Sequence, residues 1–412
     1  MGKKSFIKKI DFIFLIPVLL IVVAGILALY SSTYSVVTSE TSSLVYKQIT
    51  WVIIGLIAMF VMIFIPIRVI YALSYPLYIF GIFLLVMVLF IDRDTSGASR
   101  WIYLFGFQFQ PSEFAKITTI IALSRFLTES KISQNNIKDI VISFMIVSIP
   151  MILIREQPDL GTSLVFAAFL LPLLFWADLP IFSLFVIIAP FISIVAISLS
   201  TSRIYIFLIW MVILTVILYL AKKGILVTIS NYIVNLAVGI TTPYLWNRLK
   251  PYQQERIKNF LNPEMDPRGA GYQILQSKTA IGSGGFRGKG FLHGTQSQLR
   301  FLPEQQRDFI FSVFGEEFGF LGVITILGLY LIIILHGFNV ASLSKNRFAG
   351  YIAVGISSIF FIHIFVNIGV TVGLLPVTGL PLPFMSYGGS AMISFLAMVG
   401  LLINISVNRL KY

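Results

Sequence analysis

The chain has 412 residues, of which 57% are hydrophobic and only 11% are charged. Soluble domains carry about 25% charged residues, so this composition excludes a soluble globular protein. The lack of cysteine excludes disulfides, thiolate metal sites and a cysteine nucleophile. The net charge is +13. In a membrane protein, such an excess of Lys and Arg is first explained by their accumulation in cytoplasmic loops, so we expect no nucleic acid to bind.

The sequence contains twelve apolar runs, most of them long enough to span a membrane. Between 181 and 244, three runs fit either three spans or one span with a two-helix insertion. No internal repeat or low-complexity tract divides the chain. We therefore predict an all-α polytopic membrane protein with 10–12 transmembrane helices in a single domain, 1–412. The runs lie at 12–30, 49–66, 73–91, 112–128, 140–154, 161–177, 181–199, 203–221, 225–244, 312–336, 349–374 and 386–406.

The distribution of basic residues predicts the orientation of these spans. If the N-terminus is inside, 14 Lys and Arg residues fall in inner segments and 6 in short outer segments. The remaining 10 lie in one long loop, 245–308, to which the positive-inside rule does not apply. This asymmetry predicts cytoplasmic N- and C-termini and one large extracellular loop.

Two motifs, one before the fourth run and one at its start, carry charges near the hydrocarbon. Arg100 precedes Trp101, and Pro111 begins a helix in which Glu113 and Lys116 lie three residues apart, on one face. One interpretation is an interfacial capping pair with a belt tryptophan. The functional interpretation is that Arg100 and Lys116 hold an anionic group at the outer leaflet.

A third charged stretch follows the run at 140–154. Pro158 breaks the helical pattern, and Asp159 comes directly after the break. Broken helices at membrane depth usually line a cavity. Asp159 is equally consistent with an ordinary helix N-cap.

The long loop contains three different stretches. Residues 247–260 have the pattern of an amphipathic helix on the membrane face. Residues 262–272 are dense in turn signals. Residues 282–290 carry five glycines with Arg287 and Lys289, and such a backbone can cradle phosphate, although a flexible loop is the commoner meaning.

At the end of this loop, Asp308 stands where the chain re-enters the membrane. A carboxylate at an apolar boundary is partly desolvated, which suits a general base. Asp308 can also be the N-cap of the next span, and the two interpretations are compatible. Neither His336 nor His363 has a second metal ligand nearby in sequence, so we expect both to be packed, whereas His293 stays open.

Together, these motifs resemble the SEDS family (shape, elongation, division and sporulation) of bacterial cell-wall polymerases, and 289–298 looks most like its RodA branch rather than its FtsW branch. Two features depart from the family: Arg307 stands where Thr is usual, and ten spans are usual. The matching stretches occur in the family's order and cover most of the chain: 110–116, 157–162, 266–272, 276–277, 288–290, 302–304, 308–311 and 386–390.

The resemblance implies a peptidoglycan glycosyltransferase in the bacterial cell membrane that polymerises lipid II, with its site on the extracellular side. Asp308 would be the general base, and undecaprenyl pyrophosphate the leaving group. A divalent cation, Mg²⁺ or Mn²⁺, would fit between Asp308 and the pyrophosphate, and no organic cofactor is implied. The candidates for binding the pyrophosphate or sugars are Arg100, Glu113, Lys116, Asp159, Gln276, Lys278 and Lys289.

The resemblance also implies a class B penicillin-binding protein as transpeptidase partner, together with other elongation or division machinery. Three alternatives remain. A lipid II flippase predicts inverted repeats, and the sequence shows none. A lipid-linked glycan ligase of the O-antigen type has the same topology with a different acceptor. The third alternative is a scaffold without catalysis.

Overall fold

The computed structural model describes residues 11–34, 43–90, 100–104, 107–130, 137–198, 203–221, 224–248, 254–255, 260, 270–299 and 301–409. Each of the twelve apolar runs corresponds to one helix, which confirms the predicted all-α polytopic class. Within these described ranges, seven helices are long and apolar enough to cross a membrane. The twelve helices are α2 (Phe12–Thr33), α3 (Leu44–Phe64), α4 (Ile67–Phe90), α5 (Pro111–Glu129), α6 (Ile137–Glu156), α7 (Leu160–Trp176), α8 (Ile181–Ser198), α9 (Arg203–Leu220), α10 (Ile225–Arg248), α14 (Ile310–Leu343), α15 (Arg347–Thr371) and α16 (Gly389–Asn408).

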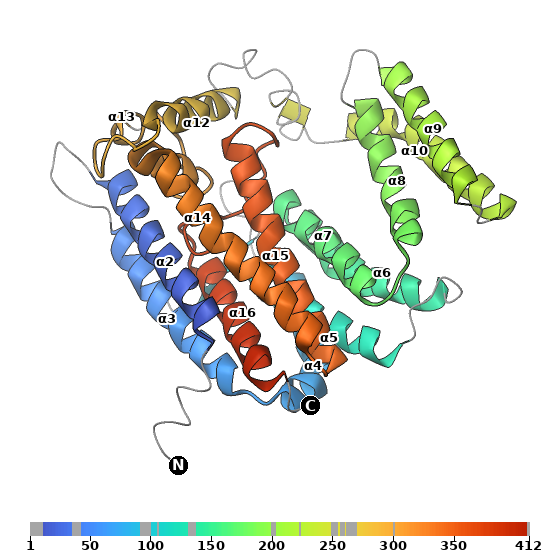
Figure 1. Cartoon of the computed structure of the whole chain (residues 1–412), viewed down its shortest axis with the longest axis horizontal. Helices are drawn as coiled ribbons and strands as arrows, with labels where there is room; N and C mark the ends of the chain where they lie inside the picture. The colour runs from blue at the N-terminus through green and yellow to red at the C-terminus, as the bar shows by residue number, and fades with distance from the viewer. Residues whose placement is uncertain are drawn as a thin grey trace.

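The last helix, α16, lies at the centre of the main bundle and packs closely on α3, while α14 contacts both α2 and α15 (Figure 1). Small residues permit this close packing. A Cβ on Gly400 would lie only 2.3 Å from the carbonyl oxygen of Met59 in α3. Most side chains of α15 and α16 are buried, whereas the outer helices expose apolar faces, as expected for contact with lipid.

Helices α8, α9 and α10 form a separate three-helix unit beside the main bundle (Figure 1). Its own apolar core is built from Ala189, Phe207, Met211, Leu214 and Leu218. The three apolar runs at 181–244 thus form three helices that pack on one another.

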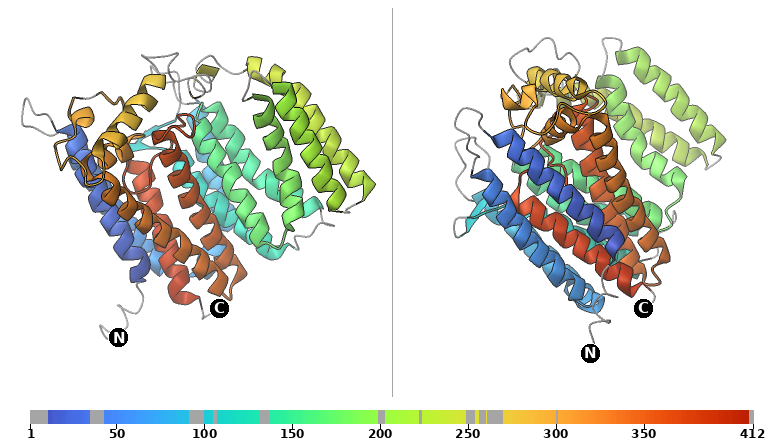
Figure 2. Two further views of the ribbon diagram at one scale, coloured as in Figure 1. Left: turned by 45° about the horizontal axis from the view of Figure 1, so that its top comes forward. Right: turned by 60° about the vertical axis from the view of Figure 1, so that its left-hand side comes forward.

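The predicted long loop, 245–308, is partly helical. The helix α10 continues to Arg248, and the loop contains α12 (Ala270–Gly284) and the short α13 (Thr295–Gln298). Most of the predicted amphipathic stretch 247–260, and the turn-rich stretch up to 269, lie outside the described residues. Figure 2 shows α12 and α13 at the end of the bundle opposite the termini.

The glycine-rich stretch packs directly on a break within α14. At this break, Gly319 has φ 61° and ψ −163°, a conformation that is essentially restricted to glycine. The backbone N–H groups of Lys289 and Gly290 donate to the carbonyls of Glu316 and Glu317, each at 3.0 Å. These N–H groups are therefore engaged within the protein and do not form a phosphate cradle.

Both termini of the described chain lie at the same end of the bundle (Figure 1). There, the carboxylate of Asp11 accepts hydrogen bonds from His336 Nε2 at 2.7 Å and from Ser406 Oγ at 2.5 Å, which ties α2, α14 and α16 together. We call this end of the bundle, where Asp11, His336 and Ser406 meet, the terminal end. The opposite end, which carries α12 and α13, is called the cavity end, after the cavity described in the next subsection.

A two-stranded hairpin stands at the cavity end, although its strands were not predicted from the sequence. The strands β1 (Ile102–Leu104) and β2 (Phe107–Phe109) pair antiparallel, with Ile102 opposite Phe109. The hairpin leads directly into α5, so it places Arg100 and Gln110 beside the first turn of that helix.

Candidate active site

A cavity of about 750 Å³ opens at the cavity end of the bundle. Its walls come from the start of α3, the hairpin, the start of α5, the break between α6 and α7, the turn before α14, and the segment 376–389 that connects α15 to α16. Charged residues from three of the motifs singled out in the sequence, around Arg100 and Glu113, at Asp159 and at Asp308, thus lie in the wall of one cavity. The charged lining residues are Lys47, Arg100, Glu113, Asp159, Glu304, Arg307 and Asp308.

Asp159 satisfies both of its sequence interpretations. Its Oδ1 accepts from the backbone N–H of Thr162 at 3.1 Å, so it is the N-cap of α7. Its Oδ2 accepts from Gln110 Nε2 at 3.3 Å, which joins the break between α6 and α7 to the start of α5. Because Asp159 also lines the cavity, the N-cap is a means of fixing a carboxylate in the wall.

Arg100 stabilises the same break from the opposite side. Its Nε donates to the carbonyl of Gln157 at 3.0 Å, and its terminal nitrogen donates to the carbonyl of Pro158. These carbonyls lack intrahelical partners because α6 ends at Glu156. A guanidinium has five N–H donors, so Arg100 can hold the break and still offer donors to an anion in the cavity.

Asp308 lies in the turn that immediately precedes α14, and its side chain is half-buried. The N-cap of α14 is Phe309, so the prediction that Asp308 caps this helix is wrong. The turn is instead fastened by the backbone: Asn367 Nδ2 donates to the carbonyl of Asp308 at 3.1 Å, and Ser386 Oγ donates to that of Arg307 at 2.6 Å. Asp308 itself lines the cavity.

Glycine at position 379 keeps the space beside this carboxylate open. A Cβ there would lie 3.9 Å from Asp308 Oδ2, and Gly379 has φ 76°, which favours glycine. The neighbouring Arg307 is exposed and pairs with Glu304 at 3.8 Å, so the wall at this point carries both signs of charge.

Glu113 and Lys116 form a buried ion pair rather than an interfacial one. Lys116 Nζ lies 2.9 Å from Glu113 Oε1, and the lysine side chain is 0% exposed. Glu113 lines the cavity, whereas Lys116 lies behind it. Lys116 Nζ is also 3.1 Å from His363 Nε2 of α15, a partner that the sequence could not indicate because 247 residues separate the two.

Gln276, Lys278 and Lys289 are not among the residues that line the cavity. Lys289 Nζ instead lies 2.8 Å from Glu316 Oε1. Glu316 also accepts from the backbone N–H groups of Gln296 and Ser297, so this pair anchors α13 to α14. Lys278 packs its side chain against Gly373 at the end of α15.

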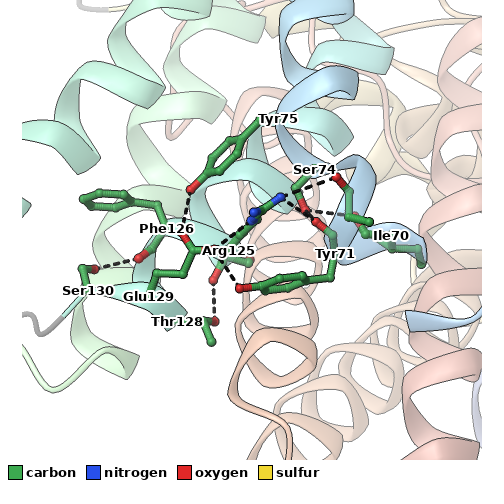
Figure 3. A network of polar contacts seen from close by, with 11 residues as sticks. Ile70, Tyr71, Ser74, Tyr75, Arg125, Phe126, Thr128, Glu129 and Ser130 are labelled. Carbon is green, nitrogen blue, oxygen red and sulfur yellow. Dashed lines mark hydrogen bonds and ion pairs between the residues drawn. The ribbon is translucent and has the colours of Figure 1, made fainter. Parts of the chain in front are cut away.

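A different polar network lies on α4 and α5 toward the terminal end (Figure 3). Arg125 pairs with Glu129 at 2.8 Å, and its guanidinium lies 4.6 Å and 4.4 Å from the ring centres of Tyr71 and Tyr75. The Tyr71 hydroxyl also donates to Glu129 at 2.7 Å. These contacts satisfy each charge locally, which indicates a structural clamp between the two helices.

Metal binding has limited support in the geometry. Among the described residues, no group of three His, Asp or Glu side chains is close enough to hold an ion by itself. The expected Mg²⁺ or Mn²⁺ at Asp308 stays a prediction.

The fold and the site define a multi-pass membrane protein with a charged cavity at one end of its helix bundle. The family described as cell cycle protein, which groups FtsW, RodA and SpoVE, matches residues 11–208 and 204–411. The chain belongs to this family, as its motifs predicted.

Named relatives and solved structures agree with this assignment. The chain is 36% identical over 409 residues to the peptidoglycan glycosyltransferase MrdB of Escherichia coli K12, covering 99% of this chain and 97% of the relative. It is 34% identical over 443 residues to the peptidoglycan glycosyltransferase RodA of Treponema pallidum, covering 98% and 99%. These relatives confirm the predicted glycosyltransferase class and its RodA-like character.

Two structural neighbours share the fold over nearly the whole chain. One comes from a study titled "Structural coordination of polymerization and crosslinking by a peptidoglycan synthase complex", with a TM-score of 0.71, 28% identity and coverage of 98% and 99%. The other is the rod shape determining protein RodA of Thermus thermophilus, with a TM-score of 0.64, 25% identity and coverage of 98% of each chain.

Proposed function

We propose that this protein polymerises lipid II into glycan strands, with Asp308 as the general base. The observation that carries the proposal is the position of Asp308 in a cavity of about 750 Å³, together with Arg100 and other charges at one end of a membrane bundle. Lipid II combines a polar disaccharide, a pyrophosphate and a long lipid tail. A charged cavity that adjoins lipid-facing helices suits each of these parts.

The reaction requires one proton acceptor and a stabilised leaving group. Asp308 takes the proton from the 4-hydroxyl of the GlcNAc on the acceptor, and that oxygen forms a bond to C1 of the MurNAc on the donor. The bond from C1 to the pyrophosphate oxygen breaks with inversion, and undecaprenyl pyrophosphate departs. Because pyrophosphate is already a good leaving group, no partner carboxylic acid is needed.

Cations in the cavity wall stabilise the departing pyrophosphate. Arg100, which is hydrogen-bonded to the break between α6 and α7, fills this role. Lys47 and Arg307 line the same cavity. Lys116 and Lys289 were candidates from the sequence, but each is already paired, with Glu113 and Glu316 respectively. We therefore assign Lys116 an indirect role and Lys289 an architectural one.

A divalent cation is compatible with Asp308 and a bound pyrophosphate. Mg²⁺ is commonly bound through one or two carboxylates together with substrate phosphates and water. In this site, Asp308 would supply the carboxylate, and the ion would offset negative charge on the leaving pyrophosphate.

The basic residues support an orientation with the cavity on the extracellular face. The terminal end carries Arg68, Arg125, Lys345, Arg347 and Arg409, as expected for a cytoplasmic face. This orientation places the cavity in the outer leaflet and the loop 245–308 outside. The neighbouring synthase complex further supports a transpeptidase, of the class B penicillin-binding type, as partner.

Reconstitution with lipid II tests the proposal against its alternatives. The purified protein, with a transpeptidase partner where one is needed, should convert lipid II into glycan polymer and release undecaprenyl pyrophosphate. Transbilayer movement of lipid II without polymer would support a flippase. Transfer to a different acceptor would support a ligase, and either result would overturn the proposal.

A further inference from the structure

A buried chain of polar contacts runs from the cavity wall through the core and back to the wall. It begins at Glu113, passes through Lys116 to His363, and ends at the carbonyl of Pro381, which also lines the cavity. Lys116 and His363 are both 0% exposed. The chain joins α5 and α15 to the segment 376–389, which forms one side of the site.

The geometry specifies how His363 uses its two nitrogens. Nδ1 lies 3.1 Å from the carbonyl oxygen of Pro381, which can only accept, so Nδ1 carries the hydrogen. Nε2 is then an acceptor, and it lies 3.1 Å from Lys116 Nζ, which can only donate. His363 thus acts as a neutral bridge between the ammonium group and the segment at Pro381.

Lys116 is correspondingly fixed in one orientation. It donates to Glu113 Oε1 and to His363, and it lies 5.2 Å from the ring centre of Phe395, in cation–π range. If His363 were lost, one N–H of a fully buried ammonium group would be left without an acceptor. Such a loss is costly, and it would allow Lys116 and its carboxylate partner to shift.

One carboxylate oxygen of Glu113 has no hydrogen-bond partner among the described residues. Its Oε1 is held by Lys116, whereas its Oε2 is buried and has no hydrogen-bond partner among the described residues. Glu113 lines the cavity and is 3% exposed. A buried carboxylate oxygen of this kind is expected to gain a donor from a bound molecule.

We propose that His363 is a positioning residue, which, through Lys116, holds Glu113 Oε2 ready to accept a hydroxyl or amide hydrogen from the sugar portion of the substrate. The inference rests on the proposed function for the identity of that substrate. Because the pyrophosphate is assigned to Arg100 and other cations of the cavity wall, replacing His363 should weaken the binding only of ligands that carry the sugars.

The test compares the binding of two lipids to the full-length protein carrying Asp308→Asn, which should consume lipid II at least about 100-fold more slowly. Adding His363→Leu should weaken lipid II binding about tenfold, because a charge-assisted hydrogen bond to the sugar is misplaced. Binding of undecaprenyl pyrophosphate, which has no sugar, should stay within twofold. His363→Gln offers both an acceptor and a donor and should restore most of the lipid II affinity.

Ser358→Ala is the matched control in α15. Its hydroxyl is buried and, among the described residues, bonds only to the carbonyl of Val354 in the same helix, so binding of both lipids should be unchanged. Equal weakening of both lipids by His363→Leu would indicate general loss of structure and overturn the inference, as would unchanged lipid II binding. Failure of the proposed function is seen separately, as wild-type protein that forms no polymer.

Discussion

One side-chain amide, that of Asn367, fixes the backbone of Asp308. Asn367 Nδ2 donates to the carbonyl of Asp308 at 3.1 Å and to the carbonyl of Leu380 at 2.9 Å. It therefore uses both of its hydrogens to hold the turn before α14 against the segment 376–389. The position of the proposed base is set from a neighbouring helix rather than from its own.

Replacing Asn367 with alanine should therefore impair catalysis more than binding. We expect kcat for lipid II polymerisation to fall at least tenfold with KM changed less than threefold, because a small displacement of a base is costly. The loss of two buried hydrogen bonds should also lower stability by about 1–3 kcal/mol. Steady-state kinetics and thermal unfolding in detergent check both effects, and a rise in KM alone would contradict this role.

Alanine at Gly319 should destabilise the break in α14. Its backbone conformation disfavours any side chain, and a Cβ would lie 2.2 Å from the backbone nitrogen of Gly288. We expect a loss of at least about 2 kcal/mol in the free energy of unfolding. Gly328→Ala in the same helix is the matched control, since nothing lies within 4 Å of its Cβ position, and it should change stability by under about 1 kcal/mol. Similar thermal unfolding of both variants would be inconsistent with a strained break.

The clamp between α4 and α5 should depend on the shape of Arg125 as well as its charge (Figure 3). Arg125→Lys keeps the charge but loses the planar stacking between Tyr71 and Tyr75, so we expect it to recover less than half of the stability lost in Arg125→Ala. The total loss should be about 1–2 kcal/mol, because the network is partly exposed. Full rescue by lysine in thermal unfolding would show that charge alone matters.

Acid should loosen the contacts of Asp11 at the terminal end. Burial raises the pKa of this carboxyl, but hydrogen bonds from His336, Ser406 and the Ile13 N–H outweigh it and hold the pKa below its ordinary value of 3.8. The resulting stability is present above pH 3.8 and is lost as the pH falls through the lowered pKa. Asp11→Asn should be less stable at pH 7 and should lack this contribution to acid sensitivity. Parallel pH curves of the two proteins in thermal unfolding would refute this.

Local sequence signals predicted the elements and part of the site. The twelve apolar runs became helices because span length and hydrophobicity are encoded within each run. The sequence offered the N-cap and the cavity as alternative interpretations of Asp159, because Pro158 marks the break beside it, and the structure shows both. The three-residue strands of the hairpin and the break at Gly319 were missed, since neither disturbs the local pattern strongly.

Contacts between segments that are distant in the sequence explain the remaining differences between the predicted and the observed site. One of the two interpretations placed Lys116 at an anionic group of a ligand, but it pairs with Glu113, and α15 and α16 enclose it with His363 and Phe395. Lys289 was expected at a phosphate, but it pairs with Glu316 across the break in α14. The partners that the sequence did not indicate, His363 and Phe395 for Lys116 and Glu316 for Lys289, lie in segments whose packing the sequence does not specify.

The most direct test of the central claim is the rate of lipid II polymerisation by Asp308→Asn at saturating lipid II. Asparagine keeps the size of the side chain but cannot accept the proton, so the rate should fall by a factor of at least about 100. Asp178→Asn is a suitable control, because Asp178 has φ 66°, which asparagine tolerates, and lies outside the cavity lining. A folded Asp308→Asn protein that polymerises lipid II at the wild-type rate would contradict the account.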